Sequence, residues 1–366
     1  MEPATYIVGL ICELASSWPG HLDVVFVGRN LSQNWAESQA LPPNISVAYL
    51  PTSMRAAIGE IARRVRRSKY DLVHLCGWGH PVLLTAVLLA GCQSIPVVVE
   101  TDTQSPVREG TWTRLVKRLF YPALFSIPRA FLPAGSRQAS YLRKYGVPVP
   151  KIRIGRMTSD VSGIRQFVDA YAADRRADRR REIGISDNIR TVFLFVGRLE
   201  EFKGLTDLFD AYLRLRSQRD DVGLLIAGGG RFEPFVRDAA SSIRSVYYLG
   251  HLIGQSVWET YCLGDVLVLP SRREPWGLVV NEAMAAGLPV IVTDVVGCID
   301  DLVVNESTGL VIQRGKREAL CSAMSLVADD VELRAKLGAA AYCAISDWTL
   351  SNEARTIEST WLELVA

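Results

Sequence analysis

The chain has 366 residues, of which 49% are hydrophobic and 22% are charged, and its formal net charge is +2. This length suits two globular domains of ordinary size. No apolar run reaches the roughly 18 residues that a membrane-spanning helix requires, and no secretion signal is recognisable. The seven cysteines are scattered and form no C-x-x-C pair. These features argue against a disulfide framework and a zinc site, and they predict a cytoplasmic protein with reduced thiols.

Short, continuous apolar runs alternate with longer helical stretches along the chain. Runs rich in Val, Ile and Leu are typical of parallel strands that are covered on both faces. The predicted strands are Asp23–Val27, Leu72–Leu75, Pro96–Val99, Thr191–Val196, Gly223–Ala227, Val246–Leu249, Val266–Leu269 and Pro289–Thr293. Helical segments between them indicate repeated βαβ units, so we expect an α/β fold with doubly wound sheets.

Two prolines, Pro148 and Pro150, interrupt the helical pattern and mark a boundary between domains. We predict an N-terminal Rossmann-like domain at residues 1–157 and a C-terminal domain at residues 158–348. A terminal helix occupies residues 349–366, and we expect it to pack back toward the N-terminal domain.

A loop with glycines and cations follows the predicted strand Thr191–Val196. It reads Gly-Arg-Leu-Glu-Glu-Phe-Lys-Gly and runs from Gly197 to Gly204, with a helix predicted directly after it. A diphosphate requires cationic donors and backbone N–H groups that can approach closely, and this loop, with Arg198 and Lys203, supplies both. The alternative is that the two cations are solvated surface charges.

Two glutamates lie eight positions apart in the next informative segment, Pro270–Val290. Glu274 lies in the loop after a predicted strand, and Glu282 lies about one turn inside the helix that Gly277 opens. A carboxylate can accept hydrogen bonds from two neighbouring sugar hydroxyls, and a helix N-terminus presents N–H groups to a phosphate. The alternative is an ordinary amphipathic helix with one exposed glutamate.

The two segments together resemble the family-4 retaining glycosyltransferases, which are group 1 glycosyltransferases. The resemblance rests on G-R-L-x-x-x-K-G, on the two spaced glutamates with P-S before them, on E-A-M-A-A-G-L-P-V, and on the spacing of the segments. It implies the GT-B fold, in which two Rossmann-like doubly wound domains face a cleft. It also implies that a hexose is transferred with retention from a UDP- or GDP-sugar, with no cofactor and no obligatory metal. The sequence shows no cluster of metal ligands.

The resemblance implies a role for each matching residue. Arg198 and Lys203 would hold the donor diphosphate and take part in catalysis. Glu274 would contact the hydroxyls of the transferred sugar, Glu282 would hold the ribose hydroxyls, and His251–Gly254 would lie by the base. The remaining donor-site residues would act chiefly through their backbone: Gly197, Gly230, Gly277, Leu278 and Val279.

The start of the N-terminal domain departs from the family pattern of a strand, a Gly-Gly loop and a helix. Tyr6–Ser17 is typical of that first helix and His21–Gly28 of the second strand, and on this interpretation the opening strand and its loop are expected to be missing. Alternatively, Tyr6–Cys12 is the first strand and the helix is severely shortened. If the strand is missing, one wall of the phosphate cleft is absent, which favours a catalytically impaired scaffold or binding subunit.

A second departure concerns histidine. Many members carry a histidine after the strand that matches Pro96–Val99, and here Asp102 lies near that place. A carboxylate there could orient the acceptor or take its proton, or it could cap a turn. His74 lies inside an apolar run and is interpreted as a satisfied core histidine. His80 follows in a strand-to-helix loop and is the better cleft residue.

The family often uses saccharide or lipid-linked acceptors, as in polysaccharide, glycolipid or cell-envelope glycan synthesis. Basic residues lie among apolar ones between Trp112 and Arg129, which is typical of a helix on an anionic membrane, here its inner face. The alternative is a core helix with solvated basic edges. Arginines at Arg175–Arg181 alternate with acidic residues, so we interpret them as a solvated helix and expect no nucleic-acid partner.

Overall fold

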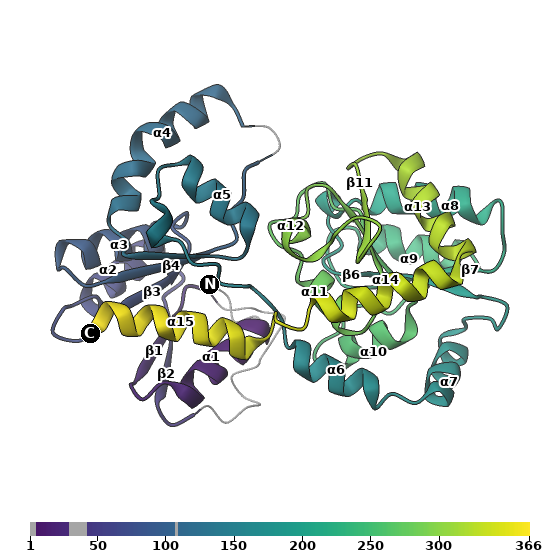
Figure 1. Cartoon of the computed structure of the whole chain (residues 1–366), viewed down its shortest axis with the longest axis horizontal. Coiled ribbons are helices and arrows are strands. Elements are labelled where there is room, and N and C mark those ends of the chain that lie inside the picture. Colours follow the sequence, from purple (N-terminus) through teal and green to yellow (C-terminus); the bar gives the residue numbers. More distant parts are fainter. Residues whose placement is uncertain (1–4, 29–41, 107–108) are drawn as a thin grey trace. The chain divides into compact units, whose positions relative to one another are not determined.

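The computed structural model describes residues 5–28, 42–106 and 109–366, and the chain divides into two compact units (Figure 1). The first unit comprises Met1–Thr158 together with Thr349–Ala366, and the second comprises Ser159–Trp348. The chain therefore leaves the first unit once and returns to it through its C-terminal helix.

Short parallel strands alternate with helices in the first unit. Its strands are β1 (Leu22–Phe26), β2 (Ile45–Tyr49), β3 (Val73–Cys76), β4 (Val97–Thr101) and β5 (Ala130–Pro133). Its helices are α1 (Thr5–Ser17), α2 (Met54–Arg64), α3 (Pro81–Cys92), α4 (Thr111–Ser126), α5 (Ser136–Lys144) and α15 (Leu350–Val365), with a 3-10 turn at Val149–Lys151.

The strands of the first unit form two separate parallel sheets rather than one. β1 pairs with β2, and β3, β4 and β5 pair in that order. One apolar core contains Val97, Val99 and Phe131, and a second contains Val98 and Leu132. Because side chains alternate along a strand, these two cores lie on opposite faces of the three-stranded sheet.

The first described segment is helical, so the interpretation of Tyr6–Cys12 as a strand is wrong. Leu10 and Leu14, one turn apart, are buried with Trp361 of α15 in the second core. The two helices lie side by side (Figure 1). Helical periodicity gives α1 an apolar stripe, and α15 provides the surface that buries it.

The second unit is built around one six-stranded parallel sheet. Its strands are β6 (Thr191–Val196), β7 (Val222–Ala227), β8 (Val246–Tyr248), β9 (Val266–Leu269), β10 (Val290–Thr293) and β11 (Gly309–Ile312). Its helices are α6 (Val161–Asp169), α7 (Ala173–Ile183), α8 (Leu205–Arg216), α9 (Glu233–Ser242), α10 (Gln255–Leu263), α11 (Leu278–Ala285), α12 (Ile299–Leu302), α13 (Arg317–Asp329) and α14 (Val331–Ala344), with a 3-10 turn at Glu201–Lys203.

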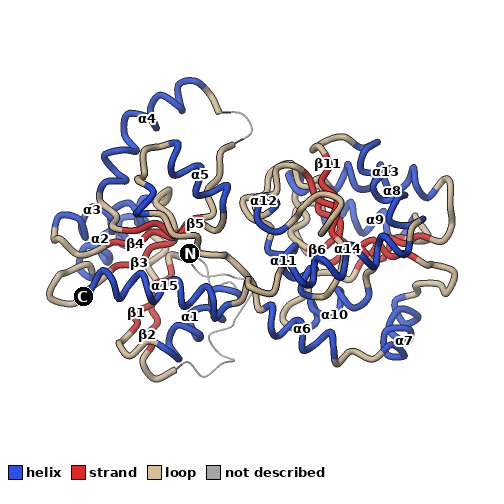
Figure 2. Tube along the Cα trace, viewed as in Figure 1, coloured by secondary structure: helices blue, strands red, loops and turns tan. Residues whose placement is uncertain are grey.

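Helices cover both faces of this sheet, which explains why every residue of β6, β7, β9 and β10 is buried (Figure 2). The strand order is β11-β10-β9-β6-β7-β8. Along the chain, β7 and β8 are added on one side of β6, and β9, β10 and β11 are then added on its other side. The two directions diverge between β6 and β9.

Helix α7 corrects one prediction, because the arginine cluster in it is not fully solvated. Arg176 donates to an Asp265 carboxylate oxygen at 2.6 Å, and Arg180 donates to the Leu263 carbonyl at 3.0 Å. Part of the cluster therefore fastens α7 to the end of α10.

Candidate functional site

Two loops meet at the carboxyl ends of β6 and β9, where the strand order of the second unit reverses. In open parallel sheets, this is the place where ligands bind, because adjacent loops diverge to opposite faces there. The loop after β6 carries Arg198 and Lys203, and the loop after β9 carries Glu274. The Arg272 amide donates to the Phe202 carbonyl at 2.7 Å and joins the two loops.

Glycine is required where these loops approach each other most closely. Gly204 has φ +74°, and a Cβ there would lie 2.1 Å from the Pro270 carbonyl oxygen. Gly228 has φ +147°, and its Cβ would lie 1.9 Å from the Gly197 carbonyl oxygen. Only glycine tolerates both the backbone conformation and the close approach. The glycines thus allow the loops after β6, β7 and β9 to pack together.

A buried ion pair lies at the centre of the site. The Lys203 ammonium pairs with the Glu274 carboxylate, and the exposed fractions of the two residues are 8% and 7%. Ser271 Oγ donates to the same carboxylate oxygen at 3.2 Å, and the Thr293 hydroxyl donates to the Ser271 carbonyl at 2.5 Å. These bonds hold Glu274 in one orientation between β9 and β10.

Three cations surround the half-buried ring of Phe202. The distances from the ring centroid are 5.6 Å for the Arg198 guanidinium, 5.8 Å for Lys203 Nζ and 5.4 Å for the Arg273 guanidinium. Arg198 and Arg273 are exposed, so their charges are accessible to a ligand. A polyanion such as a diphosphate could accept charge-assisted hydrogen bonds from cations gathered around one ring.

The buried carboxylate of Asp207, on α8, holds the loop after β9 in place. It accepts hydrogen bonds from Arg272 at 2.9 and 3.0 Å and from Arg317 at 2.8 Å. Burial alone would raise the pKa of Asp207, but the two arginines bring that pKa below its ordinary value. Asp207 therefore fixes the loop, and Arg272 is occupied in holding it, unlike its neighbour Arg273.

Glu282 lies on α11 and is half-buried. Tyr261 donates a hydrogen bond of 2.5 Å to one of its oxygens. Burial raises the pKa of Glu282 to about 7, although the bond from Tyr261 opposes that shift. The carboxyl group thus exchanges its proton near neutral pH and becomes a stronger acceptor as the pH rises.

Residues 177–343, which include this site, match the family model described as glycosyl transferases group 1. These residues make up most of the second unit, which over this range is similar to the group 1 glycosyltransferases. Alpha-D-kanosaminyltransferase from Streptomyces kanamyceticus is 31% identical over 199 residues, which cover 53% of this chain and 50% of that protein. The D-inositol 3-phosphate glycosyltransferase of Corynebacterium aurimucosum is 28% identical over 349 residues, covering 88% of this chain and 79% of that protein. The chain spans half or less of the first curated relatives that it matches.

Solved structures extend the similarity in fold to both units. HepE from Anabaena, in complex with UDP and glucose, aligns with a TM-score of 0.78 at 16% identity, covering 99% of this chain and 96% of that chain. Sucrose-phosphate synthase from Thermosynechococcus elongatus aligns with a TM-score of 0.74 at 18% identity, covering 98% and 92%. The predicted GT-B fold is thus confirmed.

Within the second unit, the predicted donor residues gather around the loops that follow β6 and β9. Lys203 pairs with Glu274, Arg198 lies near the Phe202 ring, and the turn at Gly230 packs against the Leu199 carbonyl. Gly277 opens α11 with φ +105°, so the first helical amides belong to Leu278 and Val279. These amides have no preceding helical carbonyl to bind. The loop at His251 lies against Gly229, because a Cβ added to Gly229 would lie 3.3 Å from the Cβ of His251.

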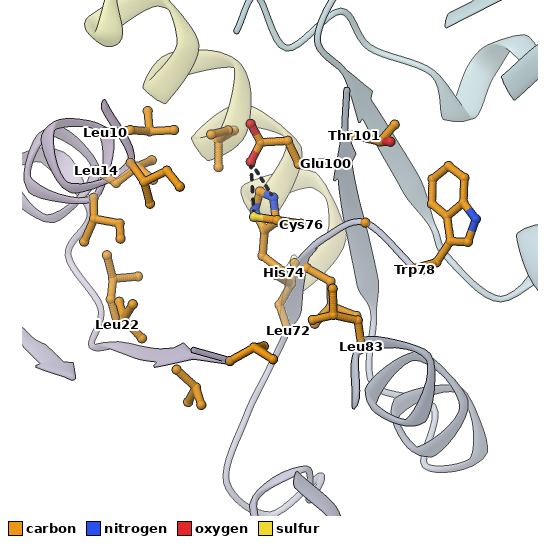
Figure 3. A pocket seen from close by; sticks show the side chains of 18 of the residues that line it. Leu10, Leu14, Leu22, Leu72, His74, Cys76, Trp78, Leu83, Glu100 and Thr101 are labelled. Carbon is orange, nitrogen blue, oxygen red and sulfur yellow. Dashed lines mark hydrogen bonds and ion pairs between the residues drawn. The ribbon is translucent and has the colours of Figure 1, made fainter. Parts of the chain in front are cut away.

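The three predicted residues of the first unit have different surroundings. Asp102 follows β4, is exposed and lines a cavity of that unit. His80 caps α3, because its Nδ1 accepts from the Val82 amide at 3.3 Å. His74 is not the satisfied core histidine that we predicted. Trp361 donates to its Nδ1 at 3.0 Å, but its Nε2 is buried without a hydrogen bond and lies 3.6 Å from Glu100 (Figure 3).

The sequence analysis assigned no role to three residues that the structure places at the candidate site. Arg273 and Ser271 lay in the quoted segment without a role, and Tyr261 lay outside it. The cluster around Phe202 had one local signal, the pair of adjacent arginines after β9. Among the residues that the structure describes, no group of side chains suits a metal ion, and none of the helices is long and apolar enough to cross a bilayer.

The raised pKa of Glu282 predicts a pH-dependent stability. Its ordinary pKa is 4.5, so between pH 4.5 and about 7 the folded state binds more protons than the unfolded state, and stability falls as pH rises. Glu282→Gln removes this loss. The free energy of unfolding of the variant minus that of wild type is therefore expected to rise by up to about 3 kcal/mol between pH 4.5 and pH 8. Urea unfolding between pH 4.5 and pH 8 measures this difference, and substitution of the exposed Glu332 by glutamine is the control. An equal pH dependence in Glu282→Gln and wild type would show that Glu282 does not titrate this way.

Proposed function

We propose that the protein transfers a sugar, with retention, from a nucleoside diphosphate donor to a saccharide or lipid-linked acceptor. The observation that carries this proposal is the buried Lys203–Glu274 pair, which lies beside two exposed arginines at the reversal of strand order. A cation joined to a sugar-binding carboxylate suits a ligand whose diphosphate and sugar are adjacent. HepE was solved with UDP and glucose, which supports the same donor class here.

The proposed roles follow from the chemistry of each group. Negative charge builds on the diphosphate as the sugar leaves, and Lys203, Arg198 and Arg273 would stabilise it as fixed cations. Lys203 has three N–H donors, so it can keep Glu274 and also bind a phosphate oxygen. Glu274 would accept from sugar hydroxyls and Glu282 from the ribose hydroxyls. The amides of Leu278 and Val279 at the start of α11, and the turns at Gly197 and Gly230, would complete the donor site.

The first unit would bind the acceptor. Asp102 is exposed and would orient the acceptor hydroxyl or take its proton. Since fixed cations can do the work of a metal ion at a leaving diphosphate, we propose that the transfer, of a hexosyl group, is metal-independent.

A screen of UDP-, GDP- and ADP-sugars tests this function. At least one donor should bind in calorimetry and be hydrolysed or transferred, and turnover should survive EDTA because no step uses a metal. The Lys203→Ala variant is the control, because it should weaken donor binding if the donor occupies this site. Turnover that disappears in chelator and returns with magnesium or manganese would contradict the mechanism, and absence of binding by every donor would contradict the function.

A second candidate function is that of a GT-B scaffold or binding subunit with impaired catalysis. The separation of β1–β2 from β3–β4–β5 favours it, because the first unit then lacks a continuous sheet behind the acceptor side. Donor binding without turnover distinguishes this candidate from the transferase.

We also propose that α4 rests on an anionic membrane, as a lipid-linked acceptor would require. Trp112, Leu119 and Phe120 are 76%, 67% and 67% exposed, and Leu115 and Val116 lie on the same face. The alternative of a core helix with solvated edges is therefore wrong. Helix α4 contains Arg114, Lys117 and Arg118 and no acidic residue. An apolar face with basic flanks suits an anionic bilayer.

Vesicle binding measures this contact. The double variant Leu119→Glu/Phe120→Glu is expected to bind phosphatidylserine vesicles at least about tenfold more weakly, since it removes two large apolar side chains from the lipid. The matched control is Val331→Glu, which changes an exposed apolar residue of the second unit. Equal sedimentation of wild type and the double variant, or no preference for anionic over neutral lipid, would exclude the membrane contact.

A further inference from the structure

Two tryptophans stack in the second unit, and one of them belongs to the loop that carries Glu274. The ring centroids of Trp276 and Trp348 are 5.2 Å apart, and the ring planes are inclined by 28°. Both residues are buried, with exposed fractions of 2% and 8%. Stacking of two aromatic rings adds to the stabilisation that burial alone provides. The stack therefore fixes the place of Trp276, which lies two positions after Glu274.

The same loop, at residues 274–277, is also fastened to α11 and to the segment after β10. Trp276 Nε1 donates to the Asn281 side chain at 3.1 Å, and Asn281 is completely buried on α11. The Cys298 amide donates to the Trp276 carbonyl at 3.1 Å, and the Gly297 amide donates to the Glu274 carbonyl at 3.0 Å. Hydrogen bonds thus hold the loop at its edges, while Trp348 supports the face of its indole.

The second tryptophan of the stack lies where the chain leaves the second unit. Trp348 is the last residue of that unit, and the next residue, Thr349, belongs to the first unit. The Trp348 amide donates to the carbonyl of Ile345, the C-cap of α14, at 3.0 Å. Helix α14 in turn packs against α11. One aromatic contact therefore joins the loop at residues 274–277 to the end of the second unit.

We infer that Trp348 is a positioning residue for recognition of the transferred sugar. It supports Trp276 and thereby holds the loop at residues 274–277 in the conformation in which Glu274 accepts hydrogen bonds from sugar hydroxyls. Because Glu274 is assigned to the sugar only in the proposed function, this role of Trp348 rests on that function. Arg198 and Lys203 lie on the loop after β6, so loss of the stack should affect the sugar more than the diphosphate.

Hydrogen exchange of the ligand-free chain is the first test. In Trp348→Leu, the amides of Gly297 and Cys298, which donate to the loop, should exchange at least about tenfold faster than in wild type. Trp348→Phe should restore most of their protection, because it again places an aromatic face against Trp276. Unchanged exchange of the two amides in Trp348→Leu would overturn the inference.

Two controls separate support of the loop from a general loss of stability. Trp258→Leu removes another indole of the second unit, which packs edge-on against Phe167 of α6, and it should not accelerate the two amides. The Gly197 amide, which donates to the last carbonyl of β7, should keep its exchange rate in Trp348→Leu. Equal acceleration at Gly197, or in Trp258→Leu, would show a purely structural role and would also overturn the inference.

Titration with donors is the second test. Trp348→Leu should bind the nucleoside diphosphate sugar about tenfold more weakly than wild type, yet bind the nucleoside diphosphate alone within about threefold of it. Trp348→Phe should recover the affinity for the sugar donor. Equal loss of affinity for both ligands, or no loss for either, would contradict a role in recognition of the sugar.

Exchange of the Trp348 amide in the unmodified chain is a further readout, which requires no substitution. Coupling between two sites is reciprocal, so the sugar donor should slow this exchange and the nucleoside diphosphate alone should not. An amide that responds equally to both ligands would overturn the inference and leave the proposed function intact. Binding of no donor by wild type would instead contradict the proposed function, and exchange at Gly297 and Cys298 would still decide whether Trp348 holds the loop.

Discussion

Alanine at Arg198 or Lys203 is expected to weaken nucleoside diphosphate binding by about ten- to a hundredfold. Each change removes one charge-assisted bond to phosphate, which contributes about 1.5–3 kcal/mol. Lys203→Ala has a second effect, because it removes the cation that is ion-paired with the buried Glu274 carboxylate. That variant should therefore also unfold at a lower temperature, whereas Arg198→Ala, at an exposed position, should not.

Calorimetric titration with UDP and GDP measures the loss, and thermal unfolding separates the two effects. Arg214→Ala is the matched control, since Arg214 is a half-exposed arginine on α8 that pairs with Asp210. Unchanged affinity in both single variants would remove Arg198 and Lys203 from the donor site.

Substitution of the two glutamates should separate recognition of the nucleotide from recognition of the sugar. Glu282→Gln is expected to weaken the free nucleoside diphosphate about tenfold at pH 8, because glutamine lacks the charge that strengthens bonds from the ribose hydroxyls. Glu274→Gln should leave that affinity unchanged or raise it, since Lys203 then loses its competing carboxylate. Turnover should instead be lost in Glu274→Gln.

The same titrations at pH 6 provide a control for Glu282. Since burial raises the pKa of Glu282 to about 7, most of its carboxyl groups are protonated at pH 6, and the difference between wild type and Glu282→Gln should shrink there. If Glu274→Gln weakens the free nucleotide as much as Glu282→Gln does, the proposed division of roles is wrong.

Periodicity predicted the buried strands of the second unit well. Thr191–Val196 and Val266–Leu269 are β6 and β9 with the same bounds, because both are continuous apolar runs covered by helices on both faces. The sequence analysis did not predict three strands, which are β2, β5 and β11. Ser46 interrupts β2, β5 has only four residues and ends in Pro133, and β11 begins with Gly309, so their apolar signal is weak.

The sequence by itself determined the α/β class, the similarity of the second unit to group 1 glycosyltransferases and the chemical type of each proposed donor residue. These depend on short-range patterns: apolar runs, glycines that open helices, and charged residues at set spacings. Tertiary structure alone decided between helix and strand for Tyr6–Cys12, since the apolar stripe of α1 is buried by α15, more than 300 positions away. It also decided which cations gather, because Arg273 reaches the Phe202 ring only when β6 and β9 pair side by side. Pairing between strands is non-local, and no pattern along the chain records it.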